Sequence, residues 1–249
     1  MSSQIISGRN PIMEAFKAGA PIEKIMIQFG VKGPVIEKIR AMAREKNIPC
    51  VEVSKQKFLD LASDVTTQGV VALLSSKKYS EVEDLLGIAC DRKQNPFLLI
   101  LDEIEDPQNL GAMIRTAECA GVHGVIIPKH HAASVNQTVS KASAGATEHM
   151  AIAKVTNIAA TMGQLKEAGL WMIGTDIEAE KSYDQIDYTM PLALVIGNEG
   201  SGIRRFVKEK CDFLIRIPMF GKIQSLNASV AAALVMYEVV RKRKAVQRT

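Results

Sequence analysis

The sequence lacks the features that define several large classes of protein. No apolar run reaches the length of a membrane span, and the amino terminus MSSQIISGRN lacks the charged-then-apolar order of a signal peptide. Cys50, Cys90, Cys119 and Cys211 form no C-x-x-C pair, so neither a zinc site nor a disulfide framework is indicated. We therefore expect a cytoplasmic protein with reduced thiols and no membrane segment.

Two further absences argue against a metal site and against a common nucleotide-binding loop. His130 and His131 have no third ligand at a matching spacing, so no metal site is predicted. The segment GNEGSG at 197–202 matches neither G-x-G-x-x-G nor G-x-x-x-x-G-K-[ST]. A nicotinamide-dependent enzyme, the first expectation for a parallel sheet with glycine-rich loops, is therefore disfavoured.

The composition is that of an ordinary folded protein, with one uneven feature. Of the 249 residues, 47% are hydrophobic and 23% charged, and the net charge is +4. Basic residues crowd the carboxyl terminus, at Arg241, Lys242, Arg243, Lys244 and Arg248. Such a tail attracts a polyanion, but it is equally typical of the solvated end of a helix.

The order of the predicted elements divides the chain into two domains. Residues 1–75 form a small α/β domain with a predicted helix over 55–61, residues 76–95 a charged linker with one short helix, and residues 96–249 a second α/β domain. Regular alternation of strand and helix favours a mostly parallel sheet with helices on both faces.

Two predictions concern the core of the second domain. The last helix, 228–244, is expected to bury one apolar stripe, formed by Val230, Ala233, Leu234, Tyr237 and Val240 or Arg241. The single tryptophan, Trp171, begins a strand and is also expected in the core.

Two strands near the carboxyl terminus end in polar, glycine-rich loops. The apolar runs 192–196 and 213–217 lead into GNEGSG and into PMFG, which is followed by Ser225, Leu226 and Asn227. Ligands of open α/β sheets bind at the carboxyl ends of neighbouring strands. The sequence therefore predicts a small-molecule site here, with Glu199, Ser225 and Asn227 beside it.

Each polar candidate also has a simpler explanation. Asn109 can merely cap a helix, as can Ser225 and Asn227. Glu199 can be a solvated turn residue or can accept a hydrogen bond from a substrate hydroxyl. Arg115 lies among apolar and small residues, so its guanidinium either reaches solvent or has a buried anionic partner, for which a phosphate is suitable.

Three sequence motifs, in their order along the chain, together resemble the motifs of one protein family. N-x-G-x-x-x-R ends at Arg115, V-I-G-N-E-G-x-G spans 195–202, and I-P-M-x-G-x-x-x-S-L-N spans 217–227. Together they closely resemble the motifs of the SpoU (TrmH-like) RNA ribose 2'-O-methyltransferases of the SPOUT superfamily. Segments 6–15 and 67–72 look like the L30e-like substrate-binding domain of one branch, which includes the bacterial enzyme that methylates a guanosine of 23S ribosomal RNA. Many relatives have His where this chain has Thr67.

The resemblance implies a fold, a donor and a site. It implies S-adenosylmethionine as methyl donor, no metal, a deep carboxyl-terminal trefoil knot, and an obligate homodimer with the site at its interface. The residues implied to bind the donor are Thr175, Gly197, Ile217, Met219 and Leu226. Those that match the catalytic and structural polar set are Asn109, Arg115, Glu199, Ser225 and Asn227.

The function implied is methylation of a ribose 2'-hydroxyl in structured RNA. The expected target is a guanosine of 23S ribosomal RNA. The alternatives are the same reaction on transfer RNA, or a non-catalytic RNA-binding or ribosome-assembly protein. Arginine rarely loses its proton, so Arg115 can orient the phosphate and stabilise charge while Glu199 or water takes the proton.

Overall fold

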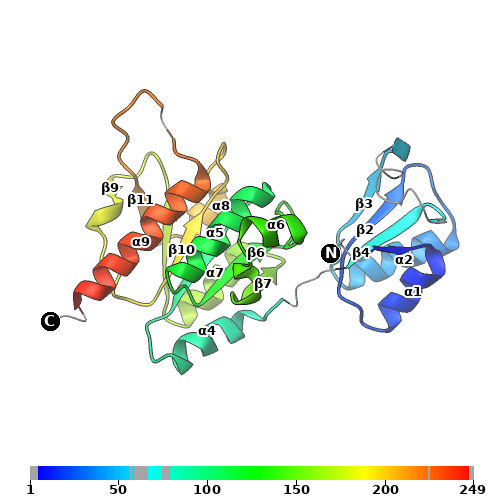
Figure 1. The fold of residues 1–249 in the computed structure, drawn as a ribbon, viewed down its shortest axis with the longest axis horizontal. Helices are drawn as coiled ribbons and strands as arrows, with labels where there is room; N and C mark the ends of the chain where they lie inside the picture. The colour runs from blue at the N-terminus through cyan, green and yellow to red at the C-terminus, as the bar shows by residue number, and fades with distance from the viewer. Residues whose placement is uncertain (1–4, 57, 59–66, 75–78, 224, 247–249) are drawn as a thin grey trace. The chain divides into compact units, whose positions relative to one another are not determined.

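The computed structural model describes residues 5–56, 58, 67–74, 79–223 and 225–246 (Figure 1). The chain forms two compact units, the first built mainly from residues 1–78 and the second from residues 79–133 and 138–249. None of the helices that the structure describes is long and apolar enough to cross a membrane.

Among its described residues, the first unit has a four-stranded sheet and the two helices α1 and α2. Its strand order is β1-β4-β2-β3, with β2 parallel to β3 and β4 antiparallel to both β1 and β2. The elements are β1 (Ile5–Ser7), α1 (Arg9–Lys17), β2 (Ile22–Gln28), α2 (Pro34–Glu45), β3 (Cys50–Val53) and β4 (Val70–Leu74). Ile12, Phe16 and Ile39 of the helices pack with Ile25 and Ile27 of the sheet. Most of the predicted helix 55–61 lies outside the described residues.

The second unit is a seven-stranded sheet of order β7-β6-β5-β10-β8-β11-β9, in which every recorded strand pair is parallel. The strands are β5 (Phe97–Leu101), β6 (Gly124–Pro128), β7 (Ile152–Val155), β8 (Trp171–Thr175), β9 (Lys181–Ser182), β10 (Leu192–Ile196) and β11 (Phe213–Arg216). The prediction of an α/β fold with a parallel sheet is confirmed. The trefoil knot stays a prediction.

Helices cover both faces of this sheet. They are α4 (Val82–Asp91), α5 (Pro107–Cys119), α6 (Gln137–Ala142), α7 (Ile158–Glu167), α8 (Arg205–Lys208) and α9 (Ala228–Val246), with short 3-10 helices at Ala146–Glu148 and Tyr183–Gln185. One apolar cluster joins α4, α7 and α8 to alternate residues of β5 and β10. The helices α5 and α9 pack against each other, and α9 also contacts β10 (Figure 1). Helix α4, inside the predicted linker, contributes Leu85 to the apolar cluster.

The prediction for the buried stripe of the last helix was wrong. The side chains that α9 buries include Ala232, Val235, Met236 and Val239, whereas Val230, Leu234 and Tyr237 are 47%, 42% and 51% exposed. Because α9 carries apolar residues on two sides, periodicity alone offers two candidate stripes.

Trp171 also departs from its prediction. It is 45% exposed, because it stands at the first position of β8, where its ring lies 5.6 Å from that of Phe213. The strand core begins at the next residue, Met172, which is fully buried.

Neither interpretation of the basic tail holds for Arg243. Its guanidinium donates hydrogen bonds to four carbonyl oxygens at the start of β5 and β10, those of Asn95, Pro96, Tyr188 and Met190, at 2.7–3.1 Å. Loss of hydration lowers the pKa of Arg243 to about 10. The side chain therefore fastens the end of α9 to the amino-terminal edge of the sheet.

A buried histidine lies at the same edge. His123 is 2% exposed; its Nδ1 accepts from the Phe97 amide at 3.0 Å, and its Nε2 lies 3.0 Å from Gln94 Oε1. Accepting at Nδ1 requires the proton to be on Nε2, so Nε2 donates to Gln94. Burial lowers the pKa of His123 to about 4.

This histidine should make folding stability depend on pH. An unfolded His titrates near 6.5, so between pH 6.5 and about 4 the native state binds fewer protons than the unfolded chain. The unfolding free energy should fall by about 1–3 kcal/mol over that interval and stay level above it. Urea denaturation at several pH values should show this fall in wild type and in His130→Gln, whose histidine is exposed, and a smaller one in His123→Gln. The same fall in His123→Gln would contradict the assignment.

Candidate functional site

A pocket of about 430 Å³ lies at the carboxyl ends of β8, β10 and β11. Its walls are the loop segments that follow these three strands and the start of α9, formed by residues 175–178, 196–203, 215–219 and 225–231 in part. Carboxyl ends of adjacent parallel strands meet at one edge, so three loops far apart in sequence surround one cavity. Its volume suits a small molecule.

The pocket gathers seven of the ten residues that the sequence analysis selected. They are Thr175, Gly197, Ile217, Met219, Leu226, Glu199 and Ser225. Asn109, Arg115 and Asn227 are not among the lining residues. All five residues expected to bind a donor therefore share one cavity, while the polar candidates form two groups with Arg115 outside both.

The loop after β10 is closed on itself and requires glycine at its first position. The Asn198 amide donates to the Gly202 carbonyl at 3.0 Å, and the Gly202 amide donates back at 2.9 Å. A Cβ on Gly197 would lie 2.1 Å from the Gly202 carbonyl carbon, a backbone atom that cannot move aside cheaply. The absence of a side chain at Gly197 thus permits the turn that forms one wall of the pocket.

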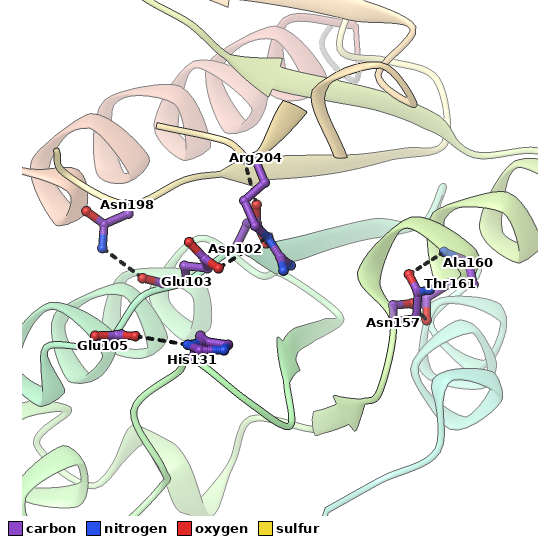
Figure 2. A network of polar contacts seen from close by, with 9 residues as sticks. All are labelled: Asp102, Glu103, Glu105, His131, Asn157, Ala160, Thr161, Asn198 and Arg204. Carbon is purple, nitrogen blue, oxygen red and sulfur yellow. Dashed lines mark hydrogen bonds and ion pairs between the residues drawn. The ribbon is translucent and has the colours of Figure 1, made fainter. Parts of the chain in front are cut away.

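An ion pair between a buried carboxylate and an arginine whose side chain is 42% exposed anchors this loop to the neighbouring strand (Figure 2). Asp102, fully buried at the end of β5, accepts from the Arg204 amide at 2.9 Å and from its guanidinium at 2.9 and 2.6 Å. The side-chain hydrogen bond to Asp102 raises the pKa of Arg204. Asn198 Nδ2 donates to the Glu103 carbonyl at 2.9 Å, and Arg204 Nε lies 3.5 Å from Glu103 Oε1. These contacts and the Asp102–Arg204 pair tie the loops after β5 and β10 together.

Sequence reasoning missed the Asp102–Arg204 pair. The available signal was the position of Asp102 directly after the apolar run 97–101, where a carboxylate is poorly hydrated and needs a partner. Nothing in the sequence selects Arg204 from the other basic residues as that partner.

Asn109 and Asn227 form the second group of polar candidates. Asn227 Nδ2 donates to Asn109 Oδ1 at 2.9 Å, and Asn227 Oδ1 accepts from the Ser229 amide at 2.9 Å. Asn227 therefore caps α9 and joins its first turn to that of α5. This fixes the start of α9, beside which Ser225 and Leu226 line the pocket.

Arg115 stands apart from both groups. It is exposed on α5 and makes no hydrogen bond or ion pair with any residue that the structure describes. Of the two alternatives for its guanidinium, solvent is the one observed in the single chain. An exposed arginine without an internal partner is available to a phosphate or to another chain.

Charged side chains of both signs border the pocket. Lys208 forms an ion pair with Asp176, whose Oδ1 also accepts from the Glu178 amide at 2.8 Å. The hydrogen bond to Asp176 raises the pKa of Lys208. Within the described part of the chain, no group of three or more His, Cys, Asp or Glu residues could hold a metal ion. The site offers loop backbone, carboxylates, Lys208 and Arg216 to an organic ligand.

Comparisons with known proteins cover most of the chain. The model of the SpoU rRNA Methylase family matches residues 96–237, and the model for RNA 2'-O ribose methyltransferase substrate binding matches residues 5–80. The Bacillus subtilis protein YacO, named for the TrmH family of tRNA/rRNA methyltransferases, is 47% identical over 242 residues, which cover 97% of this chain and 96% of YacO.

Two solved structures are similar to different extents of the chain. The crystal structure of the SpoU methyltransferase AviRb from Streptomyces viridochromogenes, in complex with the cofactor AdoMet, is 25% identical with a TM-score of 0.62, covering 97% of this chain and 90% of AviRb. The TrmH/SpoU tRNA modifying enzyme of A. aeolicus is 30% identical with a TM-score of 0.58, covering 62% of this chain and 78% of that enzyme.

Two glycines of one loop provide a matched test of the pocket wall. Gly197→Ala should lower the unfolding free energy by about 1–3 kcal/mol, because its Cβ meets backbone. Gly200→Ala should change it by less than about 0.5 kcal/mol, because its Cβ would come no closer than 3.7 Å to Asn198 Oδ1. Urea denaturation measures both, and equal effects would show that the close approach does not constrain the loop.

Proposed function

Because the chain belongs to the SpoU rRNA methylase family, we propose that it transfers a methyl group from S-adenosylmethionine to a ribose 2'-hydroxyl of RNA. One observation carries the proposal: all five residues expected to bind the donor line a single pocket, beside Glu199 and Ser225. The family match supports RNA methylation, and the pocket supports a site for the donor at the carboxyl edge of the sheet.

The pocket fits S-adenosylmethionine in size and chemistry. Gly197, Ile217 and Leu226 are proposed to hold the donor mainly through backbone groups, with Thr175 and Met219 beside it. The similar protein AviRb was crystallised with AdoMet. When bound, the donor supplies an electrophilic methyl group on a sulfonium. The loops orient this methyl group toward the substrate oxygen and exclude water.

We propose that the active form is a homodimer. The apolar stripe of α9, Val230, Leu234 and Tyr237, is exposed in the single chain, and contiguous exposed apolar surface is typical of interaction sites. Arg115 lies on α5, which packs against α9, and is absent from the pocket of its own chain. A twofold interface over these helices would cover the stripe and bring Arg115 to the partner's pocket.

The proposed reaction assigns separate tasks to the polar side chains. The 2'-oxygen attacks the methyl carbon, the carbon–sulfur bond breaks, and the hydroxyl proton passes to Glu199 or water. Arg115 keeps its own proton, holds the adjacent phosphate and stabilises the developing negative charge. Asn109 and Asn227 position the start of α9 and therefore the wall that carries Ser225.

For the target we propose ribosomal RNA, and specifically a guanosine of 23S ribosomal RNA, in the cytoplasm. The match of residues 5–80 to a substrate-binding domain supports an RNA that needs a second recognition unit. The A. aeolicus tRNA modifying enzyme is similar over only 62% of this chain. Transfer RNA is the second candidate, since the name of YacO includes both substrates. Mapping 2'-O-methyl groups in both RNA classes from a deletion strain decides between them.

Replacing Arg115 should separate chemistry from donor binding. Arg115→Ala should lower kcat by about 100-fold or more, because charge stabilisation acts in the transition state, and should leave the Kd of S-adenosylmethionine nearly unchanged. Methyl-transfer assays and calorimetry measure the two quantities. Arg92→Ala removes another exposed arginine, near the start of β5, and should alter neither. Equal losses of kcat and donor affinity in Arg115→Ala would contradict the assigned role.

A further inference from the structure

A second cavity, of about 620 Å³, lies at the amino-terminal edge of the seven-stranded sheet. Its lining comes from the turn after α4, the ends of α5 and α9, and the segments that lead into β5, β6 and β10. None of its lining residues lines the pocket at the carboxyl edge. The two cavities therefore lie at opposite edges of the sheet, and the second is also large enough for a small molecule.

The charged groups that line this second cavity are cations. They are Lys93, Arg243 and Lys244, and no Asp or Glu is among the lining residues. The ammonium groups of Lys93 and Lys244 make no hydrogen bond or ion pair with any residue that the structure describes. His123, which also lines the cavity, is neutral at physiological pH because burial lowers its pKa to about 4. The cavity therefore has an excess of positive charge.

The carboxylates that lie close in sequence to the lining residues do not remove this excess. Those of Asp91, Glu118, Asp187 and Glu238 are all outside the lining. The Asp187 carboxylate accepts from the Thr189 amide at 2.9 Å and from its hydroxyl at 2.7 Å. Glu238 pairs with Arg241 at 2.6 Å. Two of the four are thus engaged in contacts of their own.

Arg243 is a half-buried cation that has hydrogen bonds but no ion pair with a described carboxylate. Its four hydrogen bonds all end on carbonyl oxygens, which carry only partial negative charge. They use four of the five N–H groups of the guanidinium, so one N–H on Nη1 is uncommitted. A charge that has lost hydration is costly without a counter-charge, and an anion in the cavity would supply one.

Between the cations the walls are apolar and firmly held. Ala120, Val239, Val240 and Val246 are among the lining residues. Phe97 lies beneath the Arg243 guanidinium, with its ring centroid 5.3 Å away. The turn that carries Lys93 is fixed by two backbone hydrogen bonds to the last turn of α4, at 2.9 and 3.0 Å. The cavity is therefore preformed, with charge at some points and apolar surface between them.

We propose that this cavity binds a small organic anion whose carboxylate or phosphate group contacts Lys93, Lys244 and the free N–H of Arg243, while its apolar body packs against the valines. Charge-assisted hydrogen bonds favour an anion over a neutral molecule, and the apolar walls favour an organic anion over an inorganic one. The inference does not depend on the proposed function, because the methyl donor is assigned to the other cavity.

Calorimetric titration of the full-length protein tests the site with probes that separate charge from apolar body. Hexanoate and hexyl phosphate have both, hexanol has only the chain, and acetate has only the charge. Hexanoate or hexyl phosphate should bind with a Kd of about 1 mM or below, and the tighter of the two identifies the head group. Hexanol and acetate should bind at least about tenfold more weakly. Failure of both hexyl anions to bind, or equal binding of hexanol, would overturn the proposal.

Two double variants that remove the same charge locate the binding site. Lys93→Ala with Lys244→Ala should weaken binding of the tighter anion about five- to tenfold, because two charge-assisted contacts are lost. Arg92→Ala with Lys242→Ala removes neighbouring cations outside the lining and should keep the wild-type Kd. The His123 ring signals in NMR spectra of the wild type should shift during the titration, since this ring lines the cavity. Equal Kd values in the two double variants, or unshifted His123 signals, would overturn the assignment to this cavity.

Discussion

The ion pair between the buried carboxylate of Asp102 and the partly exposed Arg204 holds the candidate site together. A fully buried carboxylate is costly unless it is paired and hydrogen-bonded, and here three hydrogen bonds from one arginine satisfy it. Because Asp102 directly follows β5 and Arg204 follows the glycine loop after β10, the cost of breaking the pair keeps that loop at the sheet edge. The loop geometry at Gly197 then depends on an interaction outside the pocket.

Helix α9 links the pocket to the rest of the second unit. Its first turn lines the pocket and is joined to α5 through Asn227 and Asn109. Its last turns are fastened by Arg243 to carbonyl groups at the opposite edge of the sheet. One side of α9 is buried, and the other carries exposed apolar side chains, the surface that we propose for a second copy of the chain.

The strands, loops and motifs that depend on a local sequence pattern could be predicted from the sequence. The apolar runs 97–101 and 192–196 predicted central strands, and the glycine-rich segment after 192–196 predicted a loop of the site. The motif resemblance to the SpoU family is confirmed by the family match. Contacts between distant residues were not predictable in this way. Asp102 and Arg204 are 102 positions apart, and the buried side of α9 depends on what α5 and β10 place against it. The roles assigned to individual site residues stay predictions.

Calorimetric titration of Asp102→Asn with S-adenosylmethionine tests the account most directly. Asparagine keeps the shape of Asp102 but removes the charge that holds Arg204, so donor affinity should fall at least about tenfold, or 1.4 kcal/mol. Asp212→Asn is the matched control, because Asp212 pairs with Lys166 at 2.7 Å and accepts from the Met172 amide at the opposite edge of the sheet. Asp212→Asn should keep wild-type affinity for the donor. Wild-type affinity in a folded Asp102→Asn would contradict the role assigned to the Asp102–Arg204 pair.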